Sequence, residues 1–373
     1  MVPKKICWIT ADYFADCDFV PIKEISKSFQ VTWIIVFTRK PRYLETDFDS
    51  FKKECPHVNI IFIHQKAHIR DLDPTIIIDN YKIAKCALMQ KADYYYLNKS
   101  MVSLWSFVLW NKLKKQKIIV TSHQGQVHAG FNLKLIAKYS RIYIYGNAKI
   151  VHMFSQSQAN LFRKEFPYPR VIVTNLALKD FGKPTINIEN KEKDIVKFLS
   201  FGIINYGKNI ELLIDAACIL YEQGVTNFKV SINGKCGNWN FYKERIKYPE
   251  IFDCNIKMLP NSDIPNLFAS SHYFVQPYRI VTQSGPMKIA FNYNTPIIAS
   301  NLPGFADEMQ EGTTGYLFES ENVDDLVRVM KMVIEKHSTD YLGLKQRMSS
   351  YVKANYSDIA IGKKYVEMFN LLS

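Results

Sequence analysis

Short runs of apolar, β-branched residues alternate along the chain with longer segments whose apolar positions recur every three or four residues. The short runs predict strands and the longer segments predict amphipathic helices. Strand–helix alternation from end to end is typical of parallel sheets covered by helices. We expect a helix at 209–222 and strands at 6–10, 31–37, 58–63, 94–97, 118–121, 150–154, 171–174, 196–201, 229–233, 255–259, 273–276 and 296–299.

The length fits two domains better than one. A chain of 373 residues exceeds the size at which a single hydrophobic core stops growing, about 250–300 residues. The best linker lies within 177–194, which holds Gly, Pro, Asn and a charge run without amphipathic periodicity. We predict an N-terminal domain at 1–180, a linker at 181–195, a C-terminal domain at 196–355 and a terminal helix at 356–373.

The cysteines and the apolar runs are typical of a cytosolic protein. The 7 Cys are scattered without the spacing of zinc ligands, which predicts reduced thiols and no metal site. Three Asp-x-Asp pairs, at 16–18, 47–49 and 71–73, could hold a divalent ion, but their repetition favours chance. The chain begins with too short an apolar run for a signal peptide, and no stretch reaches the roughly 18 apolar residues of a spanning helix.

Positive charge is concentrated in one part of the chain. The formal net charge is +13, yet 201–373 holds 17 Lys and Arg against 18 Asp and Glu. Residues 101–150 hold no acid and eight basic residues: Lys112, Lys114, Lys115, Lys117, Lys134, Lys138, Arg141 and Lys149. Such a stretch is attracted to an anionic surface, and Trp105 and Trp110 beside it favour lipid. A solvated basic face and a core-facing helix remain open; nucleic-acid binding is weakened by the lack of a known motif.

A glycine-bearing turn at 201–209 is the first candidate for binding phosphate. Gly202 and Gly207 would let the backbone approach a phosphate, the following helix offers free N–H groups, and Lys208 adds a positive charge. The spacing nearly matches the triphosphate loop GxxxxGK[ST], but Asn209 replaces the hydroxyl that binds magnesium. The turn therefore favours a diphosphate contact, or a plain strand–turn–helix junction, over a triphosphate loop.

A second candidate, 276–286, also lies between a predicted strand and a helix. Gln283 and Ser284 carry donors, Gly285 allows close approach, and Pro286 suits the first helical turn, where an N–H is not needed. A helix start at the crevice outside a parallel sheet is a natural anion site. A simple helix cap is the alternative.

Taken together, these segments resemble the second domain of family 4 (group 1) glycosyltransferases, over roughly 196–336. The matching elements are Gly202, Lys208, LLIDAA at 212–217, SING at 231–234, PYR at 277–279, TQSG at 282–285, PIIAS at 296–300 and EGTTGYLF at 311–318. The PYR..TQSG loop resembles one branch of that family. The resemblance implies that the donor is bound by Gly202, Lys208, Gly234, Tyr278, Arg279, Gln283, Ser284, Gly285 and Pro286.

In the first domain the resemblance covers one stretch. TSHQGQVH at 121–128 is similar to the HDxxxH segment of that family, with Gln124 in place of the usual Asp. The resemblance implies catalytic roles for His123 and His128. It also implies the GT-B fold, in which two Rossmann-like α/β domains face a cleft and the C-terminal helices pack back toward the first domain. It further implies an acceptor-side first domain, retention of configuration, and no required metal or cofactor besides the nucleotide-sugar substrate.

Two departures bear on the donor site. The family's E-x7-E pair would fall at Val281 and Ile289, neither of which is acidic, so the residue that usually holds the ribose is absent. The Arg that often accompanies the lysine is Ile203 here. Lys208, helped by Arg279, is then the main diphosphate cation.

We therefore expect a hexosyltransferase that moves a sugar from a nucleotide-diphosphate sugar to an acceptor hydroxyl. A saccharide or lipid-linked acceptor, in cell-surface polysaccharide or glycolipid synthesis, fits an enzyme of the cytoplasm that is peripheral on the inner face of an anionic membrane. Nucleic acid is not an expected partner. The alternative, motivated by the absent Glu pair and by Gln124, is a catalytically silent subunit that binds a nucleotide sugar or a partner.

Overall fold

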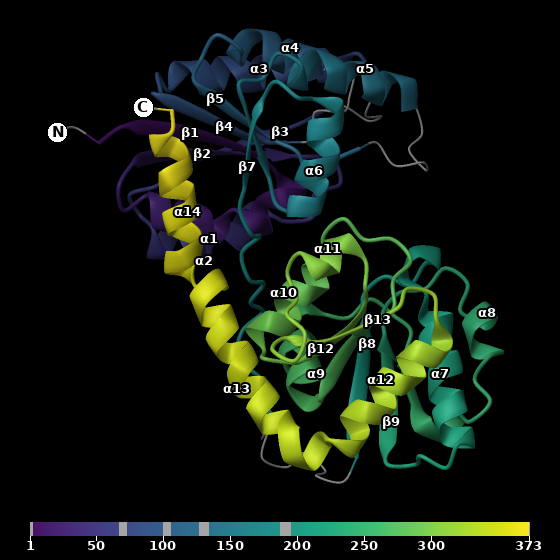
Figure 1. The fold of residues 1–373 in the computed structure, drawn as a ribbon. Helices are drawn as coiled ribbons and strands as arrows, with labels where there is room; N and C mark the ends of the chain where they lie inside the picture. Colours follow the sequence, from purple (N-terminus) through teal and green to yellow (C-terminus); the bar gives the residue numbers. More distant parts are fainter. Residues whose placement is uncertain (1–2, 67–72, 100–105, 127–133, 187–194, 373) are drawn as a thin grey trace. The chain divides into compact units, whose positions relative to one another are not determined.

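The computed structural model describes residues 3–66, 73–99, 106–126, 134–186 and 195–372 (Figure 1). Contacts divide the chain into two compact units. The first unit comprises residues 1–177 and 356–373, and the second unit comprises residues 178–355. No described helix is long and apolar enough to cross a membrane.

The first unit is built on a seven-stranded sheet in the order β3-β2-β1-β4-β5-β6-β7, with every strand pair parallel. Because β2 follows β1 on one side and β4 lies on the other, the strand order reverses between β1 and β4. A ligand crevice is expected outside the carboxyl ends at such a point. The strands are β1 (Lys5–Ala11), β2 (Gln30–Phe37), β3 (Asn59–His64), β4 (Tyr94–Asn98), β5 (Ile118–Thr121), β6 (Ile150–Met153) and β7 (Arg170–Val173).

Helices cover both faces of this sheet, and each face has its own apolar core. One core packs beneath α3 (Thr75–Met89), α4 (Ser106–Leu113) and α6 (Gln156–Glu165), and α5 (Lys134–Tyr145) lies on the same side. The other packs beneath α1 (Phe19–Ile25), α2 (Asp49–Glu54) and α14 (Asp358–Asn370). Both faces of the sheet are thus buried, as parallel sheets require.

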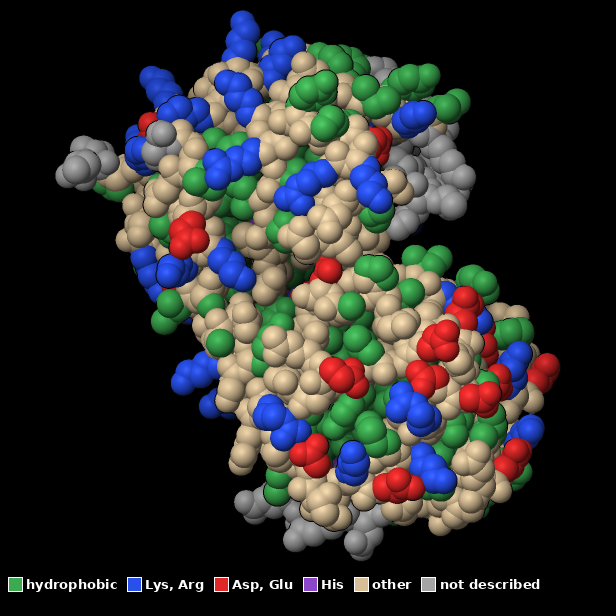
Figure 2. Space-filling model, in the orientation of Figure 1, with side chains coloured by type: hydrophobic (Ala, Val, Ile, Leu, Met, Phe, Trp, Pro, Cys, Tyr) green, Lys and Arg blue, Asp and Glu red, His purple; other side chains and the backbone are tan. Residues whose placement is uncertain are grey.

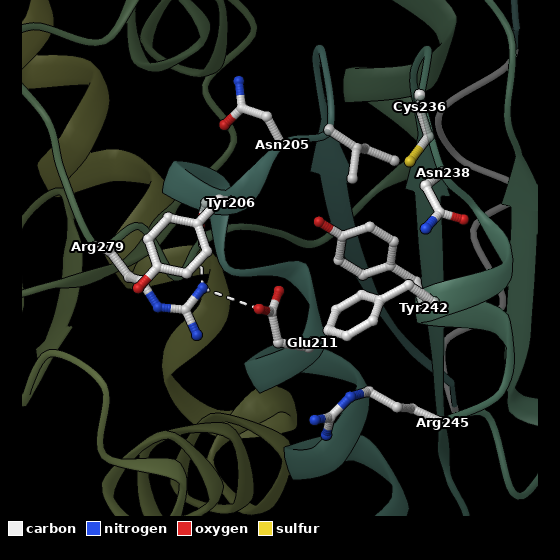
Figure 3. Close-up of a pocket in the computed structure, with 11 residues that line it drawn as sticks. Asn205, Tyr206, Glu211, Cys236, Asn238, Tyr242, Arg245 and Arg279 are labelled. Atoms are coloured by element: carbon white, nitrogen blue, oxygen red, sulfur yellow. Dashed lines mark hydrogen bonds and ion pairs between the residues drawn. The ribbon is translucent and has the colours of Figure 1, made fainter. Parts of the chain in front are cut away.

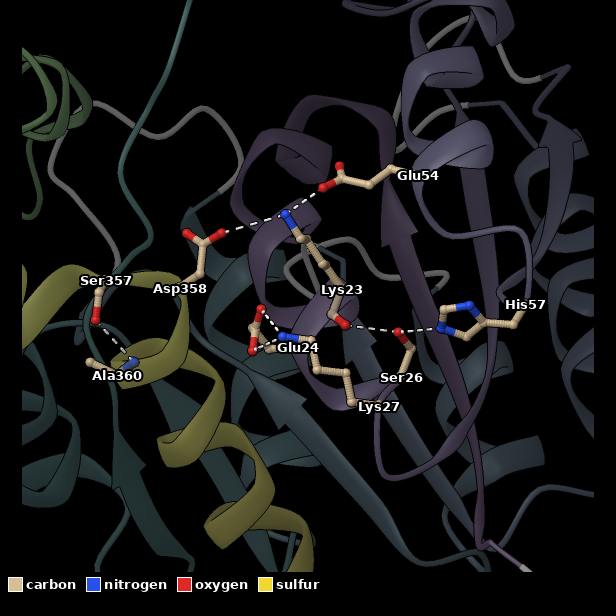
Figure 4. A network of polar contacts seen from close by, with 9 residues as sticks. All are labelled: Lys23, Glu24, Ser26, Lys27, Glu54, His57, Ser357, Asp358 and Ala360. Atoms are coloured by element: carbon tan, nitrogen blue, oxygen red, sulfur yellow. Dashed lines mark hydrogen bonds and ion pairs between the residues drawn. The ribbon is translucent and has the colours of Figure 1, made fainter.

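The last helix, α14, packs on α1 as an integral part of the first unit. Tyr365 and Phe369 are buried against Trp8, at ring-centroid distances of 5.7 and 6.2 Å. Gly362 approaches α1 so closely that a Cβ there would collide with the side chain of Glu24. Lys23 of α1 reaches both Glu54 and Asp358, the first residue of α14 (Figure 4).

The second unit has a six-stranded parallel sheet in the order β10-β9-β8-β11-β12-β13. The strands are β8 (Val196–Phe201), β9 (Phe228–Asn233), β10 (Phe252–Asn255), β11 (Tyr273–Gln276), β12 (Ile297–Ser300) and β13 (Gly315–Phe318). The helices are α7 (Ile210–Glu222), α8 (Asn240–Lys243), α9 (Ile264–Ser270), α10 (Gly285–Asn292), α11 (Pro303–Ala306), α12 (Val323–Glu335) and α13 (His337–Tyr356).

Two parallel-sheet α/β domains with a helical C-terminus confirm the fold class predicted from the sequence. Two edge strands differ from the prediction. β10 ends at Asn255, where the predicted strand began, because the edge strand pairs through the half-polar run FDCN and not through the more apolar run that follows. β13, only four residues long, was not among the predicted strands.

Candidate functional site

Two glycines let the carboxyl ends of β8 and β9 approach each other. Gly202 (φ +123°) follows β8 and Gly234 (φ +150°) follows β9, and side chains rarely adopt such backbone conformations. The Gly202 amide donates to the carbonyl of Asn233 (3.0 Å), and a Cβ at Gly234 would collide with the Gly202 carbonyl oxygen. Both glycines are needed for this geometry.

Lys208 lies in a short 3-10 turn, Tyr206–Lys208, between β8 and α7. Its ammonium group sits over the ring of Tyr278, 3.7 Å from the ring centroid, which is a favourable cation–π distance. Tyr278 is itself buried, and its hydroxyl accepts a hydrogen bond from Gln276 Nε2 (3.0 Å). The predicted donor residue Tyr278 therefore serves as a support that positions Lys208.

The guanidinium of Arg279 is engaged within the second unit. It donates to the Tyr206 carbonyl (3.0 Å) and forms ion pairs with Glu211 and Glu321, both at 2.9 Å. The Arg279 backbone amide donates to the Gly207 carbonyl (3.0 Å). Arg279 thus ties the loop that carries Lys208 to the end of β11.

The start of α10 is capped by Ser284, one of the predicted donor residues. Ser284 Oγ accepts from the Met287 amide (3.2 Å) and from Gln276 Nε2 (2.7 Å). Gln276 Nε2 also donates to the Tyr278 hydroxyl. The side-chain amide of Gln276 therefore links the Ser284 cap of α10 to Tyr278, whose ring lies under Lys208. Gln283 Nε2 is buried and has no hydrogen-bond partner within the described part of the chain, so it is a donor available to a ligand.

The predicted donor residues therefore gather at the carboxyl ends of β8, β9 and β11. A Cβ built on Gly202 would lie 4.0 Å from Cγ of Pro286, which shows that the first glycine turn adjoins the start of α10. Free helix N–H groups and a glycine-lined approach are the ingredients of an anion site.

Lys179 is a residue at this place that the sequence prediction missed. Its ammonium nitrogen lies 3.4 Å from where a Cβ on Gly285 would be. The backbone at 181–182 is hydrogen-bonded to Tyr293, which follows the C-terminal end of α10. The Phe181 amide donates to the Tyr293 hydroxyl (2.9 Å), and this hydroxyl donates to the Gly182 carbonyl (3.0 Å). Lys179 falls at the predicted domain border and carries no motif, so no local signal marks it.

A pocket of about 690 Å³ opens beside these loops, between the β8–α7 and β9–α8 connections (Figure 3). It shares only Arg279 with the residues predicted to bind the donor. Its lining comprises Ile204, Asn205, Tyr206, Glu211, Cys236, Gly237, Asn238, Phe241, Tyr242, Arg245 and Arg279.

In the first unit, His123 follows β5 at the carboxyl edge of the sheet. Its ring stacks between Phe14 and Phe154, with centroid distances of 3.9 and 4.6 Å. His123 Nε2 lies 2.9 Å from Oδ1 of Asn98, the last residue of β4. The imidazole is therefore held in both position and rotation.

Asn98 connects His123 to a buried carboxyl group. Asn98 Nδ2 donates to both oxygens of Asp18 (2.9 and 3.0 Å), which also accepts from Trp8 Nε1 (2.9 Å) and Thr10 Oγ1 (2.5 Å). Burial raises the pKa of Asp18 to about 7, although the hydrogen bonds from Thr10, Asn98 and Trp8 lower it. Asp18, Asn98 and His123 thus form a line beside the point where the strand order reverses. Neither Asp18 nor Asn98 was predicted as a site residue.

The rest of the two-His segment is only partly described. His128 lies outside the described residues. Gln124 and Gly125 are fixed by buried Arg141, which donates to their carbonyl oxygens at 3.2 and 2.7 Å. His152, behind His123, is fully buried between Tyr96 and Thr174, and burial lowers its pKa to about 3. His152 therefore stays neutral near pH 7.

Comparisons with known proteins agree with this architecture. Residues 183–354, nearly all of the second unit, match the family model described as glycosyl transferases group 1. No curated protein matches the chain.

Solved structures match over almost the whole length. A glycosyltransferase from Rickettsia africae has 16% identity and a TM-score of 0.76, covering 100% of this chain and 99% of its own. Sucrose-phosphate synthase from Thermosynechococcus elongatus has 14% identity and a TM-score of 0.74, covering 99% of both chains. HepE from Anabaena, solved with UDP and glucose, has 14% identity and a TM-score of 0.70, covering 99% of this chain and 100% of its own. At these identities the likeness establishes the fold, which is the GT-B fold, and the family match in the second unit supports sugar transfer.

Proposed function

We propose that this protein is a glycosyltransferase that moves a hexosyl group from a nucleotide-diphosphate sugar to an acceptor hydroxyl. The observation that carries the proposal is the cluster at the start of α10, where glycine turns, the helix N–H groups and the ammonium groups of Lys208 and Lys179 adjoin within the segment that matches group 1 glycosyl transferases. HepE, which shares this fold, was solved with UDP-glucose.

The chemistry follows from charge. When the glycosidic bond to the donor breaks, negative charge develops on the diphosphate leaving group, and preorganised positive groups stabilise that charge. Lys208, Lys179 and the α10 amides supply this charge without a divalent ion, and the reaction proceeds with retention of configuration. His123, whose side chain is fixed by Asn98, Phe14 and Phe154, orients a sugar hydroxyl or accepts its proton.

The direct test is thermal stabilisation by a panel of UDP-, GDP- and ADP-sugars. A specific donor at 100 times its Kd should stabilise the fold by about 2.7 kcal/mol. Lys208→Ala and Lys179→Ala should each weaken this stabilisation, whereas Lys183→Ala, which removes an exposed lysine four residues along the chain from Lys179, should not. Failure of every nucleotide sugar to stabilise the protein would refute the donor site. If a nucleotide sugar stabilises the protein but no extract that contains acceptors leads to release of nucleoside diphosphate, the result would favour a catalytically silent subunit that binds a nucleotide sugar.

We also propose that the first unit docks on an anionic membrane, where a saccharide or lipid-linked acceptor is presented. Trp110 does not face lipid, as the sequence favoured, because it is buried in the core, and Trp105 lies outside the described residues. Arg141 is also buried, so it adds no surface charge. The support comes instead from α5, whose exposed residues recur at helical spacing: Leu135, Tyr139, Ile142 and Tyr143.

Lysines border this exposed apolar face. Tyr143 donates to Asn111 on α4 (2.7 Å), Lys114 lies over the ring of Tyr143 (5.9 Å), and Lys112 lies over the ring of Tyr81 on α3 (5.2 Å). Figure 2 shows Lys and Arg side chains gathered on the first unit, whereas the second unit carries both signs. An apolar helix face bordered by lysines is typical of membrane-surface helices. Such a protein would act from the cytoplasm on the inner leaflet, in cell-surface polysaccharide or glycolipid synthesis.

A further inference from the structure

The pocket between the β8–α7 and β9–α8 connections contains a carboxylate with only one of its oxygens paired. Glu211, the second residue of α7, has a side chain that is only 10% exposed. Its Oε1 accepts from Arg279 (2.9 Å), whereas its buried Oε2 has no hydrogen-bond partner in the described ranges. An unpaired buried oxygen is costly. A hydroxyl or amide group of a ligand would satisfy it.

Aromatic rings form the sides of the same pocket. Tyr206 and Tyr242 lie on opposite sides of Glu211 in Figure 3. Tyr206 and Phe241 are 69% and 48% exposed, although each has a guanidinium over its ring. Large exposed rings at the mouth of a concave site offer apolar contact to a ligand.

The charges of the pocket are already balanced, which limits the class of ligand. Arg279 is paired with Glu211 and Glu321, and Arg245 is paired with Asp215 (2.7 Å). Among the described residues that line the pocket, no cation is left without an acidic partner to neutralise a phosphate. Uncharged polar groups of the lining include the side-chain amides of Asn205 and Asn238, which both donate and accept. A neutral ligand with many hydroxyl groups and flat C–H faces matches rings, amides and a carboxylate acceptor.

We propose that this pocket is a binding site for a neutral saccharide, separate from the donor site. Glu211 Oε2 accepts from a sugar hydroxyl, and Tyr206 and Phe241 contact the C–H faces of the sugar rings. The inference deepens the proposed function, on which it rests for its biological ligand, because a transferase acting on a polysaccharide would hold a sugar segment of the chain here.

The test is direct binding to the full-length protein without a donor. Neutral tetrasaccharides of glucose, mannose and galactose are titrated by saturation-transfer NMR and calorimetry, with uridine and a glucuronic acid tetrasaccharide as competing probes. At least one neutral tetrasaccharide should bind. Phe241→Ala and Glu211→Gln should each lower its affinity about five- to tenfold, the range for loss of one aromatic contact or one hydrogen bond to a charged group.

Tyr168→Ala is the matched control, because it removes a tyrosine that is 90% exposed in the first unit; it should leave the affinity unchanged. If Glu211→Gln fails to fold, Phe241→Ala carries the test, since its ring is half exposed. The proposal is overturned if no neutral tetrasaccharide binds, if both pocket variants bind like the wild type, or if uridine or the acidic tetrasaccharide takes this pocket instead. The measurement needs neither donor nor turnover, so its failure is distinguishable from failure of the transferase activity.

Discussion

At the scale of the residue, the imidazole of His123 takes its orientation from side chains on other strands. Asn98 Nδ2 donates to Asp18, so Asn98 Oδ1 must be the acceptor and His123 Nε2 the donor. This assignment leaves Nδ1 as the basic nitrogen. In the resembling family an Asp follows the first His, whereas Gln124 stands here. In this chain Asn98 connects His123 to the carboxyl group of Asp18.

His123→Ala should lower turnover by about 100-fold or more, the range for loss of a positioned acid–base group, with donor affinity nearly intact. Steady-state nucleoside diphosphate release and donor titration measure the two quantities separately. His64→Ala, which removes an exposed imidazole from the same unit, is the control. If the His128 variant is inactive while the His123 variant is not, the catalytic role belongs to His128.

Asp18 should make the stability of the first unit depend on pH. Its folded pKa of about 7 lies above the unfolded value of about 3.9, so the native state keeps a proton that the unfolded chain releases. The contribution of Asp18 is therefore fully present below about pH 4, falls by about 1.4 kcal/mol per pH unit as pH rises toward 7, and levels off above 7.

The measurement is urea unfolding of wild type and Asp18→Asn at pH 5, 6, 7 and 8. Tryptophan fluorescence reports mainly the first unit, which holds four of the 5 Trp. The free energy of unfolding of the wild type, measured relative to Asp18→Asn, should fall from pH 5 to pH 7 because only the wild type titrates. A constant difference across this range would show that Asp18 is ionised throughout.

At the scale of the element, the first turn of α10 combines two functions in adjacent residues. Ser284 caps the helix through its side chain, whereas Gly285 leaves open space beside the Lys179 amine, which lies 3.4 Å from where a Cβ would be. A substitution of Ser284 should therefore remove the helix cap and leave the anion site in place. A substitution of Gly285 should disrupt the anion site and leave the cap in place.

Gly285→Val should accordingly lower donor affinity by tenfold or more, because a branched side chain displaces Lys179 and blocks the approach to the helix amides. Ser284→Ala should cost about 1 kcal/mol of stability through the lost cap, with a smaller effect on donor affinity. Donor titration and thermal unfolding of both variants measure these effects. If Gly285→Val binds the donor normally, the loop is structural.

The sequence was informative where local pattern decides structure. Apolar runs located β8 and β11, and the glycines and lysine between β8 and α7 marked a turn that the structure contains. The sequence could not predict features that depend on tertiary contacts. Trp110 belongs to an apolar decapeptide that could face lipid or core, and only the packing of α4 shows that it faces the core. Asp18, Asn98 and Lys179 could not be predicted as site residues, because the contacts that place them there are with residues 80 or more positions away in the chain.

At the scale of the whole molecule, basic and apolar groups coincide on one set of helices. Lys112 is exposed on α4, Lys114 on the turn that follows α4, and Lys138 on α5. These lysines accompany the exposed apolar residues of α5, Leu135, Tyr139, Ile142 and Tyr143. In the second unit, acidic and basic residues nearly cancel. An electrostatic attraction to an anionic leaflet would therefore act on the first unit.

Vesicles with anionic lipid should pellet the wild type at low salt more than a Lys112/Lys114/Lys115/Lys117→Gln variant. Each lysine near such a surface contributes about 1 kcal/mol, and the attraction is screened over about 8–10 Å at physiological salt. The variant should therefore bind at least tenfold more weakly, and wild-type binding should fall as salt rises. Leu135→Ser/Tyr139→Ser should weaken binding at every salt concentration, because it removes apolar contact.

The matched control removes the same charge from exposed lysines of the second unit, as Lys229/Lys331/Lys336/Lys353→Gln. Pelleting that is equal for all variants, or indifferent to anionic lipid, would show that the charge is a solvated face. Preferential binding of an oligonucleotide at the same salt would favour a nucleic-acid partner.

The packing of α14 on α1 also has a consequence for biosynthesis. Ile361, Tyr365 and Phe369 complete a core that otherwise consists of residues between 6 and 150, so the first unit cannot finish folding until α14 has emerged from the ribosome. The second unit, although synthesised later than most of the first, has its whole sequence available earlier. The order of folding during translation should therefore be reversed relative to the usual N-terminal-first order. The unfinished first unit must meanwhile avoid aggregation with an open apolar face.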